Sequence, residues 1–147
     1  MTNEEKRDQI EAVYSRSRRL FPDVPELTVE ELDRLSSSIS VVLVDVRAEK
    51  EQAVSMIPGA VTAKAFEQNR ERYLGMTVVA YCTVGHRSGL YTKKLLADGW
   101  QAFNLKGAIL SWTHAGRDLE DHEGPTRKVH VAGEKWSLEA DGYDPTW

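Results

Sequence analysis

The chain has 147 residues, 41% hydrophobic and 29% charged, which is typical of one globular domain that forms its core without disulfides or metals. Its 19 basic and 23 acidic side chains give a net charge of −4, which argues against binding to nucleic acid or to an anionic membrane. The single cysteine excludes an internal disulfide, and no Cys and His residues have the spacing of a zinc site, so we expect no metal and no cofactor.

No segment of the sequence resembles a targeting signal. The first residues are hydrophilic and lack the apolar core of a signal peptide, and no apolar run approaches the length of a membrane span. A lone thiol is typical of proteins from a reducing compartment. We therefore expect a cytoplasmic protein that does not associate with membranes.

The hydrophobic pattern divides the chain into three parts. Residues 1–22 have an amphipathic helical pattern that stops near two prolines, which predicts an N-terminal helical extension. Residues 23–120 alternate strand-like and helix-like segments, which predicts a single domain. Residues 121–147 are polar with scattered apolar side chains, and we interpret them as a tail packed on the domain.

Two continuous apolar runs predict the central strands of this domain. Residues 41–44 and 77–81 are apolar on both faces, as is typical of strands buried inside a parallel sheet. The capping box Thr28–Glu31 predicts a helix before the first run, and Asp98–Gly99 predicts the end of a helix after the second. Strands that alternate with helices predict an α/β fold, with a central, mostly parallel β-sheet flanked by helices.

The segment Cys82–Ser88 follows the second apolar run and carries the candidate chemistry. Sites in open parallel sheets form outside the carboxyl ends of the strands, which is where Cys82 is predicted to lie. Gly85 allows a tight turn, while the loop amides, the start of the next helix, His86 and Arg87 can stabilise a thiolate. Position alone leaves two interpretations of Cys82 open, a nucleophile and an inert buried thiol.

Five motifs in the same order resemble the rhodanese family and extend over about residues 27–120. They are Val44-Asp45-Val46-Arg47, Glu51 followed by Ile57-Pro58-Gly59-Ala60, Tyr81-Cys82-Thr83-Val84-Gly85-His86-Arg87-Ser88, Gly99-Trp100, and Leu105-Lys106-Gly107 with Trp112. The sequence departs from the family pattern at Gln52, Ser55, Met56, Tyr91, Thr92 and Ala108. None of these departures replaces the loop cysteine or the loop glycine. The resemblance implies a rhodanese-like fold and a single-domain thiosulfate sulfurtransferase.

The resemblance also implies a mechanism in which Cys82 carries sulfur as a persulfide. Its thiolate attacks the outer sulfur of a small donor such as thiosulfate, and a thiol or cyanide then removes that sulfur. With no second cysteine to resolve the persulfide, the acceptor must be external, either a small molecule or the cysteine of a partner protein. The residues implied to hold the terminal sulfur are Thr83, Val84, Gly85, His86, Arg87 and Ser88, with Asp45 and Arg47 in support.

Two other classes of function stay open. One is a binding or regulatory module that keeps the fold without catalysis, or only carries sulfur within a complex; the intact cysteine and full-length loop argue against it. The other is a phosphatase or arsenate reductase. Four residues separate Cys82 from Arg87, as in the resembled sulfurtransferases, whereas the related phosphatases and arsenate reductases have five.

Individual side chains near the motifs keep alternative roles. Asp45 orients the loop through Arg47 or a loop amide, or else caps local backbone. The spacing of Arg47 and Glu51 predicts a helical ion pair. Arg87 contacts the donor, points outward or pairs with an acid, and His86 raises the electrostatic potential of the loop, carries a proton or faces solvent.

Three histidines and the C-terminal tail lie outside the motifs. His114, His122 and His130 lack metal-ligand spacing, and we expect all three to lie at the surface. The tail could line the mouth of the loop, but we expect it to pack on the far side of the domain.

Overall fold

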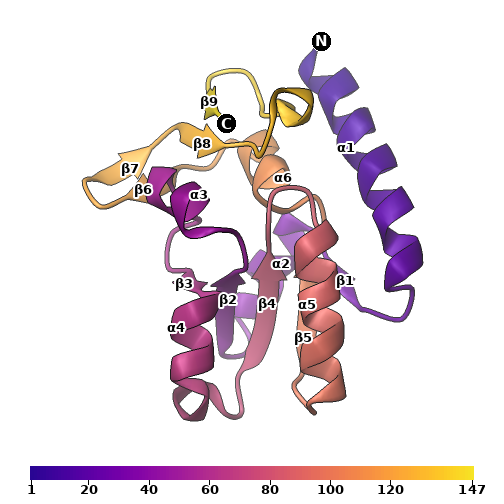
Figure 1. The fold of residues 1–147 in the computed structure, drawn as a ribbon, viewed down its shortest axis with the longest axis vertical. Coiled ribbons are helices and arrows are strands. Elements are labelled where there is room, and N and C mark those ends of the chain that lie inside the picture. The colour runs from indigo at the N-terminus through magenta and orange to yellow at the C-terminus, as the bar shows by residue number, and fades with distance from the viewer.

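The computed structural model describes all of residues 1–147 and confirms the α/β class (Figure 1). Five strands form one sheet in the order β1-β5-β4-β2-β3, and every neighbouring pair is parallel. The strands are β1 (Glu26–Leu27), β2 (Val41–Asp45), β3 (Val61–Thr62), β4 (Thr77–Tyr81) and β5 (Ala102–Leu105). The helices are α1 (Asn3–Ser17), α2 (Val29–Ser36), α3 (Glu49–Val54), α4 (Ala63–Gln68), α5 (His86–Ala97) and α6 (Ala108–His114).

The two faces of the sheet are covered by different helices. Val42 and Val78 pack in one cluster with residues of α4 and α5. Val79 and Tyr81 face the other way and pack in a larger cluster with residues of α1, α2 and α6. Because successive side chains of a strand point to opposite faces, both faces of β4 are apolar and all five of its residues are buried. This double burial explains the continuous apolar runs.

Local capping fixes where the first two helices begin. The Thr28 hydroxyl accepts a hydrogen bond from the Glu31 amide at 3.1 Å, and the Glu31 carboxylate accepts one from the Thr28 amide at 3.0 Å. This is the capping box that the sequence predicts for α2. Thr2 and Glu5 form a second capping box at the start of α1. Each box satisfies amides that the first helical turn leaves without partners.

Helix α1 and the C-terminal tail meet beyond the carboxyl ends of the central strands (Figure 1). Beyond α6 the chain forms an antiparallel pair, β6 (Leu119–Asp121) with β7 (Gly124–Thr126), and then, within the tail, a parallel pair, β8 (Lys128–His130) with β9 (Asp144–Thr146). Apolar residues of α1 and of the tail join the larger core cluster: Ile10, Tyr14, Val129, Val131, Leu138 and Tyr143. None of the helices has the length and apolar character needed to cross a membrane.

Candidate active site

Cys82 lies between the central strand and the helix that follows it. Strand β4 ends at Tyr81, Cys82 follows it directly, and α5 begins at His86. The Cys82 side chain is buried, and its sulfur accepts hydrogen bonds from the Gly85 amide at 3.2 Å and from the Ser88 hydroxyl at 3.3 Å. Two donors and the positive end of a 12-residue helix therefore face the sulfur. Hydrogen-bond donors and a helix N-terminus of this kind suit an acceptor that carries negative charge.

The loop conformation depends on Gly85. Its backbone has φ 130° and ψ 4°, a combination that residues with a Cβ rarely adopt. The Asn104 side-chain amide of β5 donates to the Gly85 carbonyl at 2.9 Å, and the Tyr14 ring of α1 lies against the Gly85 Cα. An added Cβ would lie 2.7 Å from that ring. Contacts from two other elements therefore hold Gly85, the residue whose amide faces the Cys82 sulfur.

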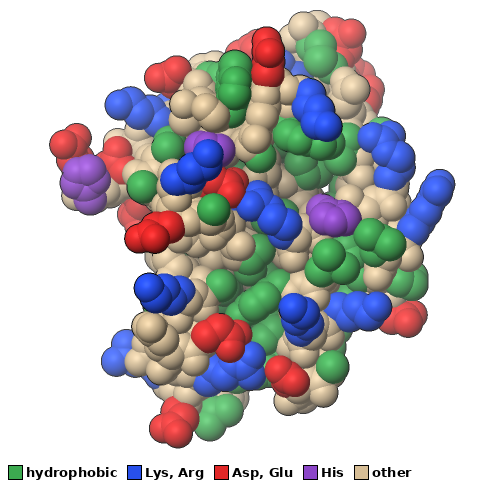
Figure 2. Space-filling view, viewed as in Figure 1, with side chains coloured by type: hydrophobic (Ala, Val, Ile, Leu, Met, Phe, Trp, Pro, Cys, Tyr) green, Lys and Arg blue, Asp and Glu red, His purple; other side chains and the backbone are tan.

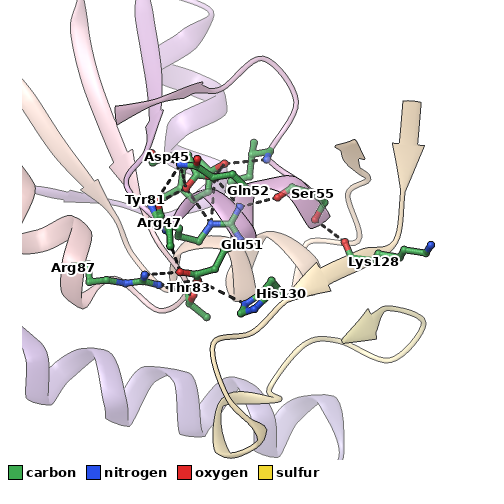
Figure 3. A network of polar contacts seen from close by, with 12 residues as sticks. Asp45, Arg47, Glu51, Gln52, Ser55, Tyr81, Thr83, Arg87, Lys128 and His130 are labelled. Atoms are coloured by element: carbon green, nitrogen blue, oxygen red, sulfur yellow. Dashed lines mark hydrogen bonds and ion pairs between the residues drawn. The ribbon is translucent and has the colours of Figure 1, made fainter. Parts of the chain in front are cut away.

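A buried ion pair lies at the end of strand β2 (Figure 3). The Arg47 guanidinium donates to both Asp45 oxygens, with a shortest distance of 2.7 Å, and both side chains are fully buried. The Tyr81 hydroxyl donates to the same carboxylate at 2.6 Å and accepts from the Ile57 amide. Burial, together with the negative charge of Asp45, raises the pKa of Tyr81 well above its usual value. Asp45 thus contacts Tyr81, the residue immediately before Cys82.

A second ion pair joins the loop to helix α3. The Arg87 guanidinium donates to the two Glu51 oxygens at 2.7 and 3.1 Å, and it also donates to the Thr83 hydroxyl (Figure 3). Burial acts to raise the pKa of Glu51, but the hydrogen bonds from Arg87 hold it below its usual value. The expected helical pair of Arg47 and Glu51 is wrong, because α3 begins after Arg47 and each residue pairs with a partner outside the helix.

His130 of strand β8 lies beside this second pair. Its Nδ1 atom is 3.8 Å from a Glu51 oxygen and accepts a hydrogen bond from the Ala132 amide at 3.1 Å. The side chain is buried, so the expected surface position is wrong for His130, while His114 is half-buried and His122 is exposed. Burial lowers the pKa of His130, which favours the neutral ring. The side chains contain no group of three or more potential metal ligands.

Comparison with known proteins identifies the domain. The family model for the rhodanese-like domain matches residues 28–115. The chain belongs to the rhodanese-like domain family. A sulfurtransferase from Allochromatium vinosum is 33% identical over 110 residues, which cover 69% of this chain and 99% of that protein. The predicted resemblance is therefore confirmed, and the chain is a member of the rhodanese-like sulfurtransferase family.

Solved structures share the rhodanese-like fold. A rhodanese-like domain protein from Staphylococcus aureus is 29% identical, with a TM-score of 0.56 over 67% of this chain and 98% of its own. A thiosulfate sulfurtransferase from Pseudomonas aeruginosa is 24% identical, with a TM-score of 0.57 over 82% of this chain. The present chain spans only 23% of the length of that protein, and the similarity shows a common fold.

Segments outside the rhodanese-like match form part of the mouth above Cys82. A pocket beside the cysteine is lined by Val13 and Ser17 of α1 and by Ala132 and Trp136 of the tail. The tail therefore does not pack only on the far side of the domain, and that expectation is wrong. In Figure 2, apolar side chains gather between the tail and α1, above the start of α5.

The structure brings the predicted loop residues together and adds others that sequence reasoning missed. His86 is exposed, and its Nδ1 lies 3.1 Å from the Ser17 hydroxyl. The missed residues are Tyr14, Glu51 as the partner of Arg87, Asn104, His130 and Trp136. Glu51 belongs to a recognised motif, which was a usable signal. The other four stand outside the quoted motifs and carry no local signal of a functional position.

Proposed function

We propose that the protein is a sulfurtransferase that moves sulfane sulfur from a donor through a Cys82 persulfide to a thiol or cyanide. The observation that carries this proposal is the environment of the sulfur. The buried Cys82 sulfur accepts hydrogen bonds from a backbone amide and a hydroxyl at the start of a helix, and this supports the role of a nucleophile rather than that of an inert core residue.

The reaction takes two steps when thiosulfate is the donor. The Cys82 thiolate attacks the outer sulfur, the new S–S bond forms, and the old S–S bond breaks with its electron pair leaving on sulfite. An acceptor thiolate or cyanide then attacks the same outer sulfur, and the electron pair of the Cys82–sulfur bond returns to the cysteine. The negative terminal sulfur between these steps is held by loop groups of Thr83, Val84, Gly85, His86, Arg87 and Ser88.

The remaining predicted residues have supporting roles in this proposal. Asp45 and Arg47 hold Tyr81 and, through it, the start of the loop. Glu51 holds the Arg87 guanidinium, which in turn donates a hydrogen bond to the hydroxyl of the loop residue Thr83. The lone cysteine favours a reducing compartment such as the cytoplasm and requires an external acceptor, either a small thiol or a partner protein.

Mass spectrometry of the intact chain after incubation with thiosulfate tests this proposal. We expect the mass to rise by one sulfur atom and to return to its starting value when cyanide is added, with release of thiocyanate. Cys82→Ser should remove the gain while circular dichroism and thermal unfolding stay unchanged. A folded wild-type chain that gains no sulfur from thiosulfate or from an organic thiosulfonate would instead favour a non-catalytic module. Hydrolysis of p-nitrophenyl phosphate through Cys82 would favour the phosphatase alternative.

A further inference from the structure

The pocket beside Cys82 has mostly apolar walls. It has a volume of about 290 Å³, near the lower end of the range for small-molecule sites. Val13, Val84, Ala132 and Trp136 line it around the cysteine. A donor must bring its sulfane sulfur to the Cys82 thiolate, so the rest of the donor lies between these walls.

The two outer walls are tied to one another. The Lys6 ammonium of α1 donates to the Glu139 carbonyl of the tail at 2.9 Å, and the Asp141 amide donates to the Asn3 side chain at 2.9 Å. Trp136 also packs against the larger core cluster. The walls are therefore held in place before a substrate binds, which lowers the entropic cost of binding a group that fits between them.

The charge near the mouth is largely neutralised. Arg87 is the one Lys or Arg side chain that lines the pocket, and both of its terminal nitrogens donate to the buried Glu51 carboxylate. The compensated charge offers a dianion such as thiosulfate little net attraction. The charged oxygens of the thiosulfate dianion, placed against apolar walls, would also lose hydrogen bonds to water without replacement. An apolar group would instead be stabilised there by leaving water.

We propose that this pocket selects donors whose sulfane sulfur is attached to an apolar organic group of about one aromatic ring, in preference to donors that lack an apolar group of that size. The inference rests on the proposed sulfur transfer and names its substrate class. With an aryl thiosulfonate, the Cys82 thiolate attacks the terminal sulfur and an S–S bond forms. The bond from that sulfur to the sulfonyl sulfur breaks, and its electron pair leaves on the sulfinate. Trp136 and Val13 determine specificity, because they line the part of the pocket away from the loop.

Benzenethiosulfonate and methanethiosulfonate test the selection because they carry the same charge and the same reacting sulfur. The full chain is mixed with each donor at pH 7.5, and kcat/KM for sulfur loading of Cys82 is measured by quenched mass spectrometry. Each value is divided by the rate of the same donor with N-acetylcysteine, which corrects for intrinsic reactivity. We expect a corrected preference for benzenethiosulfonate of about tenfold or more, equivalent to roughly 1.4 kcal/mol.

Two variants with matched controls connect the preference to the pocket. Trp136→Ala and Val13→Asn should each reduce the corrected ratio to within about threefold of one. Trp147→Ala, which alters an exposed tryptophan, and Ala12→Asn, which alters an exposed position of α1, should keep the wild-type ratio. If Trp136→Ala does not fold, Val13→Asn on the capped helix α1 still gives the answer.

The outcomes separate this inference from the proposed function. If Cys82 loads from both thiosulfonates at equal corrected rates, sulfur transfer stands and the selection is wrong. A wild-type preference that survives both pocket substitutions also overturns the role of these walls. If no donor, thiosulfate included, loads Cys82, the proposed function itself fails.

Discussion

Replacement of Gly85 by alanine is the most direct perturbation of the sulfur-binding loop. The φ of 130° is strained for any residue with a Cβ, at a cost of about 1–3 kcal/mol. The new Cβ would also lie 2.7 Å from two carbons of the Tyr14 ring, which is buried and has little freedom to move. Overpacking of this kind costs about 1–3 kcal/mol. We therefore expect Gly85→Ala to lower the free energy of unfolding by about 2–6 kcal/mol.

A second glycine with positive φ separates these two contributions. Gly99 has φ 92°, and no atom lies within 4 Å of the position that an added Cβ would take, so Gly99→Ala should cost only the backbone strain of about 1–3 kcal/mol. Gly85→Ala should also displace the amide that faces the Cys82 sulfur. Because small misplacements at reacting groups have large effects, we expect sulfur loading to slow on the order of 10²-fold.

Urea unfolding and sulfur loading by mass spectrometry measure these two effects. The double variant Gly85→Ala with Tyr14→Leu should show a favourable coupling energy, since the smaller side chain relieves the contact. Equal destabilisation by Gly85→Ala and Gly99→Ala would refute the role of the Tyr14 contact. A stable Gly85→Ala chain that loads sulfur at the wild-type rate would refute the role given to the loop conformation.

Two further substitutions, each with an exposed-site control, test the buried titratable side chains around the loop. Asp45→Asn leaves the buried Arg47 guanidinium without its ionic partner and should lower the free energy of unfolding, measured in urea, by about 3–5 kcal/mol. The control Asp118→Asn breaks an exposed ion pair and should lower it by less than about 1 kcal/mol. Equal losses in the two variants would contradict the buried ion pair of Asp45 and Arg47. Burial lowers the pKa of His130 in the folded chain below the value of about 6.5 that it has in the unfolded chain. As the pH falls through this range, the unfolded chain therefore binds a proton at His130 before the folded chain does. The free energy of unfolding should then fall as the pH is lowered from 7.5 to 5.5. In thermal melts across this range, His130→Gln should make the fall shallower and the exposed-site control His122→Gln should not; identical slopes would exclude His130 as a contributor.

The sequence by itself determined the elements that depend on local signals. The runs at 41–44 and 77–81 predict buried strands because β-branched and aliphatic residues without polar alternation fit only a sheet covered on both faces. The Thr28 capping box predicts the start of α2 because its hydrogen bonds join residues three positions apart. The position of Cys82 between β4 and α5 follows from the same reasoning. These features require no knowledge of distant parts of the chain.

Only the tertiary structure decided which distant groups meet at the loop. Glu51 meets Arg87 across 36 positions of sequence, and Tyr14 lies against Gly85 because α1 packs beside α6 in the larger core cluster. His130 and Trp136 arrive from a tail whose polar composition gives no indication of where it packs. The physical reason is that such contacts depend on how whole elements are arranged in space, whereas periodicity and capping report only on residues within a few positions of one another.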